Sequence, residues 1–206
     1  MPASGETPSV RVALGVDLQR AYVPAAALLE AMRFPGGHVT LIHVASEHPP
    51  IAVEHGVEGL DQRYFDETER LGRAALEEAG AILSAMGLTV ECRIVRDLAA
   101  RGLVTTSEAE EIDVVAVNAE RKPVIGVNAV GSVTAGITSA PRICLLIAKG
   151  ERQNRGFLRA VLATDHSPCA NACLDRFLAL APKGITEILV LCPWEIEEDD
   201  AERVAR

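Results

Sequence analysis

Aromatic side chains are scarce in this sequence, at 3 % of 206 residues, so a folded core must be built from Val, Ile, Leu and Ala. No apolar run approaches the roughly 20 residues that a membrane-spanning helix needs. The stretch Met1 to Thr7 also lacks the charged-then-apolar layout of an export signal. We therefore expect a cytoplasmic protein that does not act at a membrane.

Positive charge is also in short supply. The chain has 20 Lys and Arg against 29 Asp and Glu, a net charge of -9. A sequence-independent grip on nucleic acid needs a surplus of basic residues against the phosphates, so we expect no nucleic-acid partner. The 5 cysteines are an odd number without the density of a disulfide scaffold, which is typical of a reducing compartment.

Recognisable catalytic and metal-binding motifs are missing as well. The sequence has no Ser-His-Asp order, nucleophile elbow or P-loop, so we do not expect an enzyme. Cys169 and Cys173 lie four residues apart but lack further ligands, and we expect two small thiols facing a core. The histidines around residues 38–55 match no metal signature, and no metal site is predicted.

The sequence does contain a repeat. The run V-R-V-A-L-G-V-D ends at Asp17, and the run F-L-R-A-V-L-A-T-D ends at Asp165. A helical pattern, a Pro/Gly stop and a second apolar run follow each of them. This order predicts a strand, a helix and a strand, stated twice, and a duplicated α/β unit is the simplest explanation.

Only the first repeat continues into a complete pattern of alternating strands and helices. We predict strands at 10–16, 39–44, 89–95, 114–117 and 143–148, and helices at 22–33, 60–86, 97–110 (with Asp97 as its cap) and 133–139. Such alternation predicts an α/β fold with a doubly wound parallel sheet. The expected organisation is a complete domain at residues 9–149, a linker at 150–156 and a truncated second domain at 157–206.

Three features of this pattern resemble the universal stress protein family. They are Asp17 in G-V-D, Val44 at the end of L-I-H-V, and Gly131-Ser132-Val133 followed by a short helix, Ala140-Pro141 and an apolar strand. The resemblance implies a five-stranded parallel sheet in the order 3-2-1-4-5, followed here by a partial β-α-β second repeat. It also implies a non-catalytic stress-response or regulatory module that forms a homodimer, since members often dimerise through the last strand.

The resemblance also implies a nucleotide site. Binding members carry G-x2-G-x9-G-(S/T), whose glycines let backbone amides approach the phosphates. In such a site Asp17 would face the adenine or ribose, the Val44 backbone would line the base pocket, and Gly131, Ser132 and Val133 would hold the phosphates. Counting back from Gly131 places Asn118 and Arg121 at the first two glycine positions. With two of three glycines lost, we expect weak or lost nucleotide binding.

Other interpretations of the same residues stay open. In the alternative function, an ATP-binding switch with slow hydrolysis, the Arg121 guanidinium would replace backbone contacts to the phosphate. Asp17 equally suits a helix cap, and Gly131-Ser132 equally suits a turn followed by a cap. A nucleotide alpha-hydrolase-like enzyme is disfavoured, because it would need a Gly- and Ser-rich loop where this chain has Asp17-Leu18-Gln19-Arg20.

The incomplete second repeat cannot surround a core of its own. It must dock on the first domain, pair with a symmetry mate, or be what remains of a longer tandem protein. The last explanation is the one the sequence favours, because Trp194 to Arg206 resembles the beginning of a loop and helix.

Overall fold

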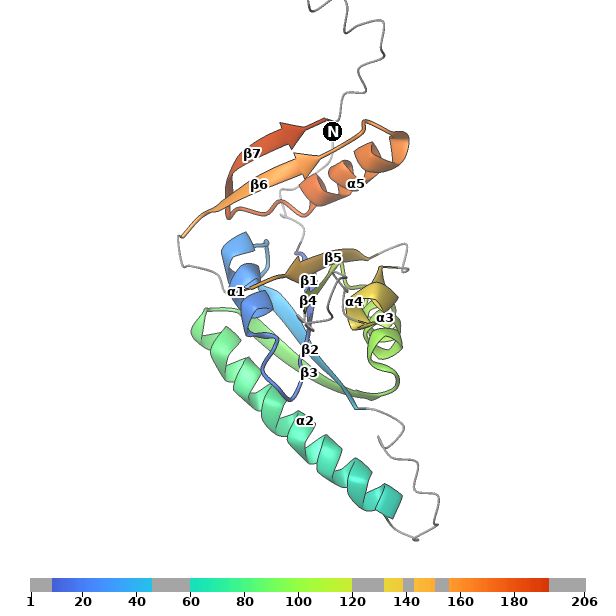
Figure 1. Cartoon of the computed structure of the whole chain (residues 1–206). Coiled ribbons are helices and arrows are strands. Elements are labelled where there is room, and N and C mark those ends of the chain that lie inside the picture. Colours follow the sequence, from blue (N-terminus) through green and yellow to red (C-terminus); the bar gives the residue numbers. More distant parts are fainter. Residues whose placement is uncertain (1–8, 46–59, 120–131, 139–142, 151–155, 193–206) are drawn as a thin grey trace, which may run out of the picture.

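A computed structural model describes residues 9–45, 60–119, 132–138, 143–150 and 156–192 (Figure 1). The first sheet and its helices comprise β1 (Arg11–Gly15), α1 (Val23–Met32), β2 (His38–Ala45), α2 (Leu60–Ala85), β3 (Thr89–Arg96), α3 (Ala99–Ala109), β4 (Val114–Asn118), α4 (Ser132–Ile137) and β5 (Cys144–Ala148). A smaller unit follows, made of β6 (Leu158–Ala163), α5 (Pro168–Ala179) and β7 (Ile185–Leu191). None of the helices within these ranges is long and apolar enough to cross a bilayer.

The five strands of the first sheet are all parallel and run in the order β3-β2-β1-β4-β5, which confirms the predicted topology. Side chains alternate across β1, so that Val12 and Leu14 join the core beneath α1 and α2, whereas Ala13 joins the core beneath α3 and α4. Both faces of the central strands are therefore covered, which explains why those strands are apolar at nearly every position.

The start of α3 differs from its prediction. The residue at the cap position is Leu98, and no side chain caps this helix, so the expected role of Asp97 as the cap is wrong. The Asp97 carboxylate lies one residue earlier, where it accepts hydrogen bonds from the Leu98 amide at 2.6 Å and from the guanidinium of Arg101. An aspartate before a helix can satisfy either a backbone or a side-chain donor, and the choice depends on which donors come within reach.

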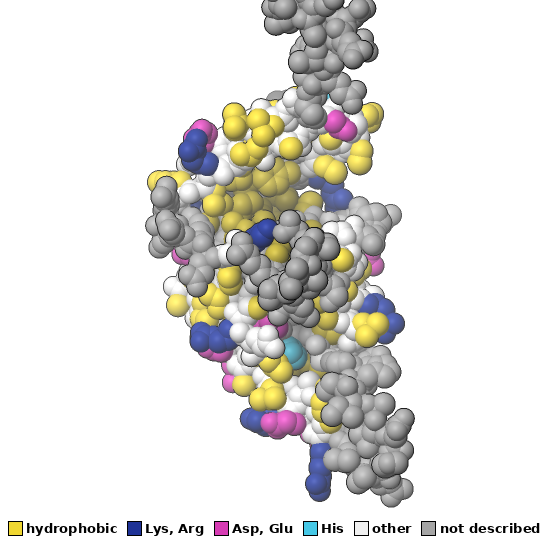
Figure 2. Space-filling model, viewed as in Figure 1, with side chains coloured by type: hydrophobic (Ala, Val, Ile, Leu, Met, Phe, Trp, Pro, Cys, Tyr) yellow, Lys and Arg dark blue, Asp and Glu magenta, His cyan; other side chains and the backbone are white. Residues whose placement is uncertain are grey.

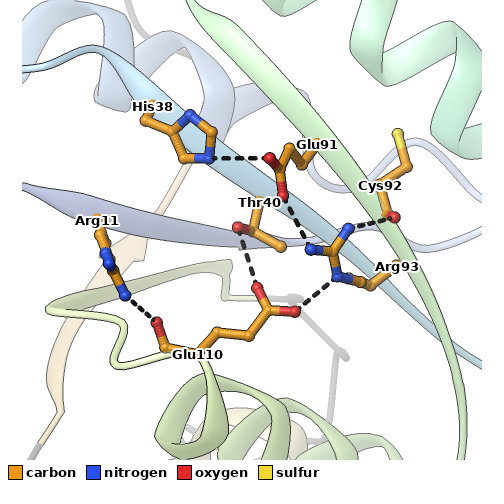
Figure 3. A network of polar contacts seen from close by, with 7 residues as sticks. All are labelled: Arg11, His38, Thr40, Glu91, Cys92, Arg93 and Glu110. Carbon is orange, nitrogen blue, oxygen red and sulfur yellow. Dashed lines mark hydrogen bonds and ion pairs between the residues drawn. The ribbon is translucent and has the colours of Figure 1, made fainter.

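A polar network ties the carboxyl end of α3 to the first three strands of the sheet (Figure 3). Glu110, the residue that ends α3, accepts hydrogen bonds from Arg93 Nε at 2.6 Å and from the Thr40 hydroxyl at 3.4 Å. Its backbone carbonyl accepts from Arg11 Nη1 at 2.9 Å. The positive charge of a guanidinium at the carboxyl end of a helix also interacts favourably with the helix dipole. The network therefore fixes the carboxyl end of α3 at the edge of the sheet that lies opposite the candidate site.

The β6–α5–β7 unit packs against the first domain. Its helix starts as the sequence suggests, with the Ser167 hydroxyl accepting from the Ala170 amide at 3.2 Å and a proline in the first turn. After α5, the amides of Lys183 and Gly184 donate to the carbonyls of Arg33 at 3.3 Å and Met32 at 3.0 Å, at the end of α1. Leu180 is buried in the core that lies beneath α1 and α2. Docking on the first domain is therefore the arrangement that this structure adopts.

The cysteines on α5 correct another prediction. Cys169 and Cys173 are exposed and do not face a core. Phe177 and Leu180, at the carboxyl end of this helix, pack against the core beneath α1 and α2. Within the described ranges, no group of three His, Cys, Asp or Glu side chains is placed to hold a metal ion.

Candidate functional site

The candidate site lies where β1, β2 and β4 end. The chain moves from β1 to β2 and β3 on one side of the sheet and then returns to β4 and β5 on the other side. Ligands of open parallel sheets bind at such a reversal, outside the carboxyl ends of the strands. The topology alone therefore brings the predicted residues after β1, at the end of β2 and at the end of β4 to one edge.

Asp17 follows β1 by two residues and is half-buried. Its Oδ1 accepts a hydrogen bond from the Ala21 amide at 2.8 Å, which closes the loop between β1 and α1. The residue at the cap position of α1 is Tyr22, so Asp17 orders this loop and does not cap the helix itself. The Ala21 amide therefore occupies one acceptor position of the Asp17 carboxylate.

Val44 lies near the end of β2, level with Asp17 if the β1–β2 register is continued by two residues, and its side chain packs against α3. A Cβ atom added to Gly102 of α3 would lie 2.9 Å from Val44 Cγ1. The glycine thus lets α3 approach the sheet over this valine, and Val44 joins the core beneath α3 and α4. This contact fixes the backbone that the family resemblance assigns to a base pocket.

His43 is a structural residue at this edge that the sequence did not single out. Its ring is buried, and Nδ1 lies 2.9 Å from the carbonyl oxygen of Val16, the residue before Asp17. Because a carbonyl only accepts, Nδ1 carries the proton in this hydrogen bond. The ring packs against Gly72 of α2, where an added Cβ would lie 2.3 Å from His43 Cδ2. His43 thereby holds the end of β1, and with it Asp17, against β2 and α2.

Asn118 is the last residue of β4 and pairs with Ala148 of β5. The register Leu14 to Ala116 between β1 and β4, continued by two residues, places Asn118 level with Val16. Asn118 is not among the residues with positive φ, so its extended backbone does not need a glycine. Its Oδ1 is buried and has no hydrogen-bond partner among the described residues. The alternation along β4 puts this side chain on the same face of the sheet as Val114 and Ala116, the face that α1 and α2 cover.

The phosphate end of the predicted site is described only in part. Arg121 and Gly131 lie outside the described residues. Ser132 is the first residue of α4, and Val133 is half-buried against the core beneath α3 and α4. Val44 and Val133 therefore border the same core, from the sheet and from α4 respectively.

A second polar contact borders the loop after β1. Arg20, which has a φ of 61°, pairs with Glu78 of α2 at 2.9 Å, and the phenol of Tyr22 is buried beside them. Burial, and then the nearby Glu78 carboxylate, raises the pKa of Tyr22 above its ordinary value. This phenol therefore stays neutral at physiological pH. The contact joins the loop that carries Asp17 to α2, independently of His43.

Comparisons with known proteins agree on the fold. No protein-family model matches the sequence. No curated protein matches it either. Among solved structures, the universal stress protein UspA from Lactobacillus plantarum matches 69 % of this chain and 99 % of its own, with 14 % identity and a TM-score of 0.55.

Two further structures are informative. A universal stress protein from Archaeoglobus fulgidus DSM 4304 matches 96 % of this chain and 72 % of its own, with 16 % identity and a TM-score of 0.66. A universal stress protein in complex with cAMP matches 68 % of this chain and 96 % of its own, with 19 % identity and a TM-score of 0.51.

These likenesses agree with the observed α/β architecture, strand order and helix placement. The chain therefore has the fold of the universal stress proteins.

Proposed function

We propose that this chain is a non-catalytic stress-response or regulatory module of the universal stress protein type, working in the cytoplasm as a dimer, in which adenine-nucleotide binding is weak or lost. The observation that supports this proposal is Asn118 at the end of β4, whose Oδ1 is buried. A glycine at this point would leave bare backbone for a ligand to approach. Asparagine puts a buried side chain at this position instead.

Titration calorimetry of the full chain with ATP and Mg²⁺ tests this proposal. We expect a dissociation constant weaker than about 100 µM. The double variant Asn118→Gly with Arg121→Gly restores both glycines of the motif, and we expect it to tighten ATP binding roughly tenfold. As a matched control, Asn118→Asp keeps the side-chain volume and should leave the affinity low.

An ATP-binding switch is the second candidate. It is favoured by the positions of Asp17, Val44 and Asn118, which lie at the carboxyl ends of three adjacent strands. A fold neighbour is in complex with cAMP, so cAMP and AMP belong in the same titration series. A micromolar affinity of the unmodified chain that Gly131→Val abolishes would replace our first proposal with this one. In that case Arg121→Ala should weaken binding as well, because its guanidinium would contact the phosphates.

A further inference from the structure

The two-stranded sheet of the β6–α5–β7 unit is exposed on one face of β6 and on both faces of β7, where Ile188 and Val190 of the opposite face are 48 % and 52 % exposed. Along β6, Leu158, Ala160 and Leu162 are half-buried, whereas the residues between them are exposed. Neighbouring residues of parallel strands point to the same side, so the register identifies the rest of the exposed face. This outer-face patch consists of Arg159, Val161, Ala163, Glu187, Leu189 and Leu191.

The patch is strongly apolar for a surface. Val161, Leu189 and Leu191 are 61 %, 54 % and 51 % exposed. Figure 2 shows hydrophobic side chains on the surface of this unit, at the top of the view. A sheet of parallel strands is normally covered on both faces, because helices cross over each side of it. An uncovered face of this kind marks an interaction surface.

In the first repeat, helices cover the face that is equivalent to this patch. When the two repeats are aligned on Asp17 and Asp165, Val161 corresponds to Ala13, and the strand register makes Leu191 the counterpart of Ile42. Ala13 and Ile42 are completely or almost completely buried, beneath α3 and α4. The second repeat keeps large apolar side chains at these positions but has no such helices among its described residues. At these positions Val161 and Leu191 are therefore exposed, 61 % and 51 %.

The charges and side-chain sizes of the patch favour the same patch on a second copy of the chain as its partner. Within one chain, Arg159 and Glu187 form a bidentate ion pair, with N–O distances of 2.7 and 2.9 Å. The patch therefore carries no net charge, although the net charge of the chain is -9. The register pairs are Arg159 with Glu187, Val161 with Leu189, and Ala163 with Leu191. A two-fold axis parallel to the strands would place each β6 residue over the β7 partner of a second chain. Opposite charges would then face each other, and each smaller side chain would face a larger one.

We propose that the outer-face patch of β6 and β7 is a homodimer interface, in which two chains stack these sheets face to face about a two-fold axis. This contact differs from the last-strand contact that the family resemblance implies. It rests on the dimer of the proposed function and assigns the surface through which that dimer forms, without depending on a nucleotide. Its failure would appear in the mass of the protein in solution, whereas failure of the proposed function would appear in the ATP titration.

Sedimentation analysis of the full chain and of two matched variants tests this interface. We expect the unmodified chain to form a dimer. Leu189→Glu places a carboxylate at the centre of the patch and should weaken the dimer roughly tenfold or more. Leu98→Glu changes a similarly exposed leucine, 56 % against 54 %, on the first domain and should leave the dimer intact. A monomeric unmodified chain, a dimer that Leu189→Glu does not weaken, or equal loss in both variants would overturn the proposal.

A charge-pairing experiment decides the case even if Leu189→Glu unfolds the β6–α5–β7 unit. The variant Arg159→Glu carries two acids in the patch, and the variant Glu187→Arg carries two bases. Each alone should dimerise more weakly than the unmodified chain, since like charges would face each other across the axis. An equimolar mixture should form a dimer that contains one chain of each kind. If the mixture associates no better than the separate variants, the face-to-face arrangement is wrong.

Discussion

At the scale of single residues, the contact between His43 and Gly72 shows how a buried polar ring is accommodated. The ring fills the space that a side chain on α2 would otherwise occupy, and its hydrogen bond to Val16 holds it in place. Because the ring is buried and bonded, it cannot swing away from an added methyl group. Glycine at position 72 is therefore a packing requirement, although glycine normally weakens the interior of a helix.

We predict opposite effects for two glycine substitutions in the same helix. Gly72→Ala should lower the free energy of unfolding by about 1–3 kcal/mol, because its Cβ would overlap the His43 ring. Gly80→Ala should raise it by about 0.5–1 kcal/mol, since its nearest neighbours lie 3.9 Å away and alanine favours helix. Urea denaturation of the two variants measures both values. Equal effects would mean that the His43 ring does not constrain α2.

At the scale of the elements, α3 is the helix that most directly shapes the candidate site. It approaches β2 over Val44 through Gly102, and it approaches α4 through Gly136, where an added Cβ would lie 2.5 Å from Ala100 Cβ. Its far end is fixed by the Glu110 network (Figure 3). The position of α3 over the sheet therefore depends on glycine contacts near the site and on polar contacts at the opposite edge.

The Glu110 network can be tested against its neighbour in sequence. Glu110→Gln keeps the shape but removes the charge that faces Arg93 at 2.6 Å, and we expect a loss of about 1 kcal/mol in the free energy of unfolding. Glu111→Gln should change it by less than about 0.5 kcal/mol. The Glu111 side chain is 84 % exposed and lies 3.4 Å from Arg11, whereas that of Glu110 is 27 % exposed. Thermal denaturation at moderate salt compares them. Equal losses would show that the network does not contribute to stability.

At the scale of the whole molecule, a short seam between the end of α1 and the segment after α5 joins the two units (Figure 1). The backbone approaches so closely there that a Cβ on Gly184 would lie 1.6 Å from the carbonyl oxygen of Ala31. The guanidinium of Arg33 lies over the ring of Phe157, 6.0 Å from its centroid. The small unit depends on this seam, because two parallel strands and one helix do not make a stable core by themselves.

Disrupting the contacts of the seam should increase amide hydrogen exchange in the β6–α5–β7 unit without unfolding the first domain. We predict that Gly184→Ala increases amide hydrogen exchange in β6 and β7 roughly tenfold, while exchange in β1 and β4 stays unchanged. Lys183→Ala is the control, because it keeps the amide that donates to Arg33 and removes only an exposed side chain. Slower or unchanged exchange in β6 and β7 of the Gly184→Ala variant would contradict the role of the seam.

Local patterns were enough to predict most of the fold. Alternating apolar runs and helical stretches predict the five parallel strands, and the family resemblance supplies the order in which they lie; both are confirmed. Individual boundaries shift by one or two residues, as for β2, which extends from His38 to Ala45. The start of α3 was predicted wrongly, since nearby donors compete for the Asp97 carboxylate.

The candidate site was predictable in outline only. The sequence placed Asp17 after the first strand and Val44 at the end of the second, as observed, but it placed Asn118 after the fourth strand, whereas Asn118 is the last residue of β4. His43 carried no signal, because a histidine within an apolar strand does not reveal what lies opposite it. Whether Arg121, Gly131 and Ser132 hold phosphates stays a prediction for the titration experiments.

By itself the sequence determined the α/β class and the direction of the strands, because these depend on residue periods and on the crossovers that parallel strands require. Tertiary structure alone decided that the His43 ring bonds the Val16 carbonyl and packs against Gly72, that Cys169 and Cys173 are exposed, and that the β6–α5–β7 unit docks on α1. Each of these outcomes depends on contacts between residues far apart in the chain. Such contacts leave no period in the sequence.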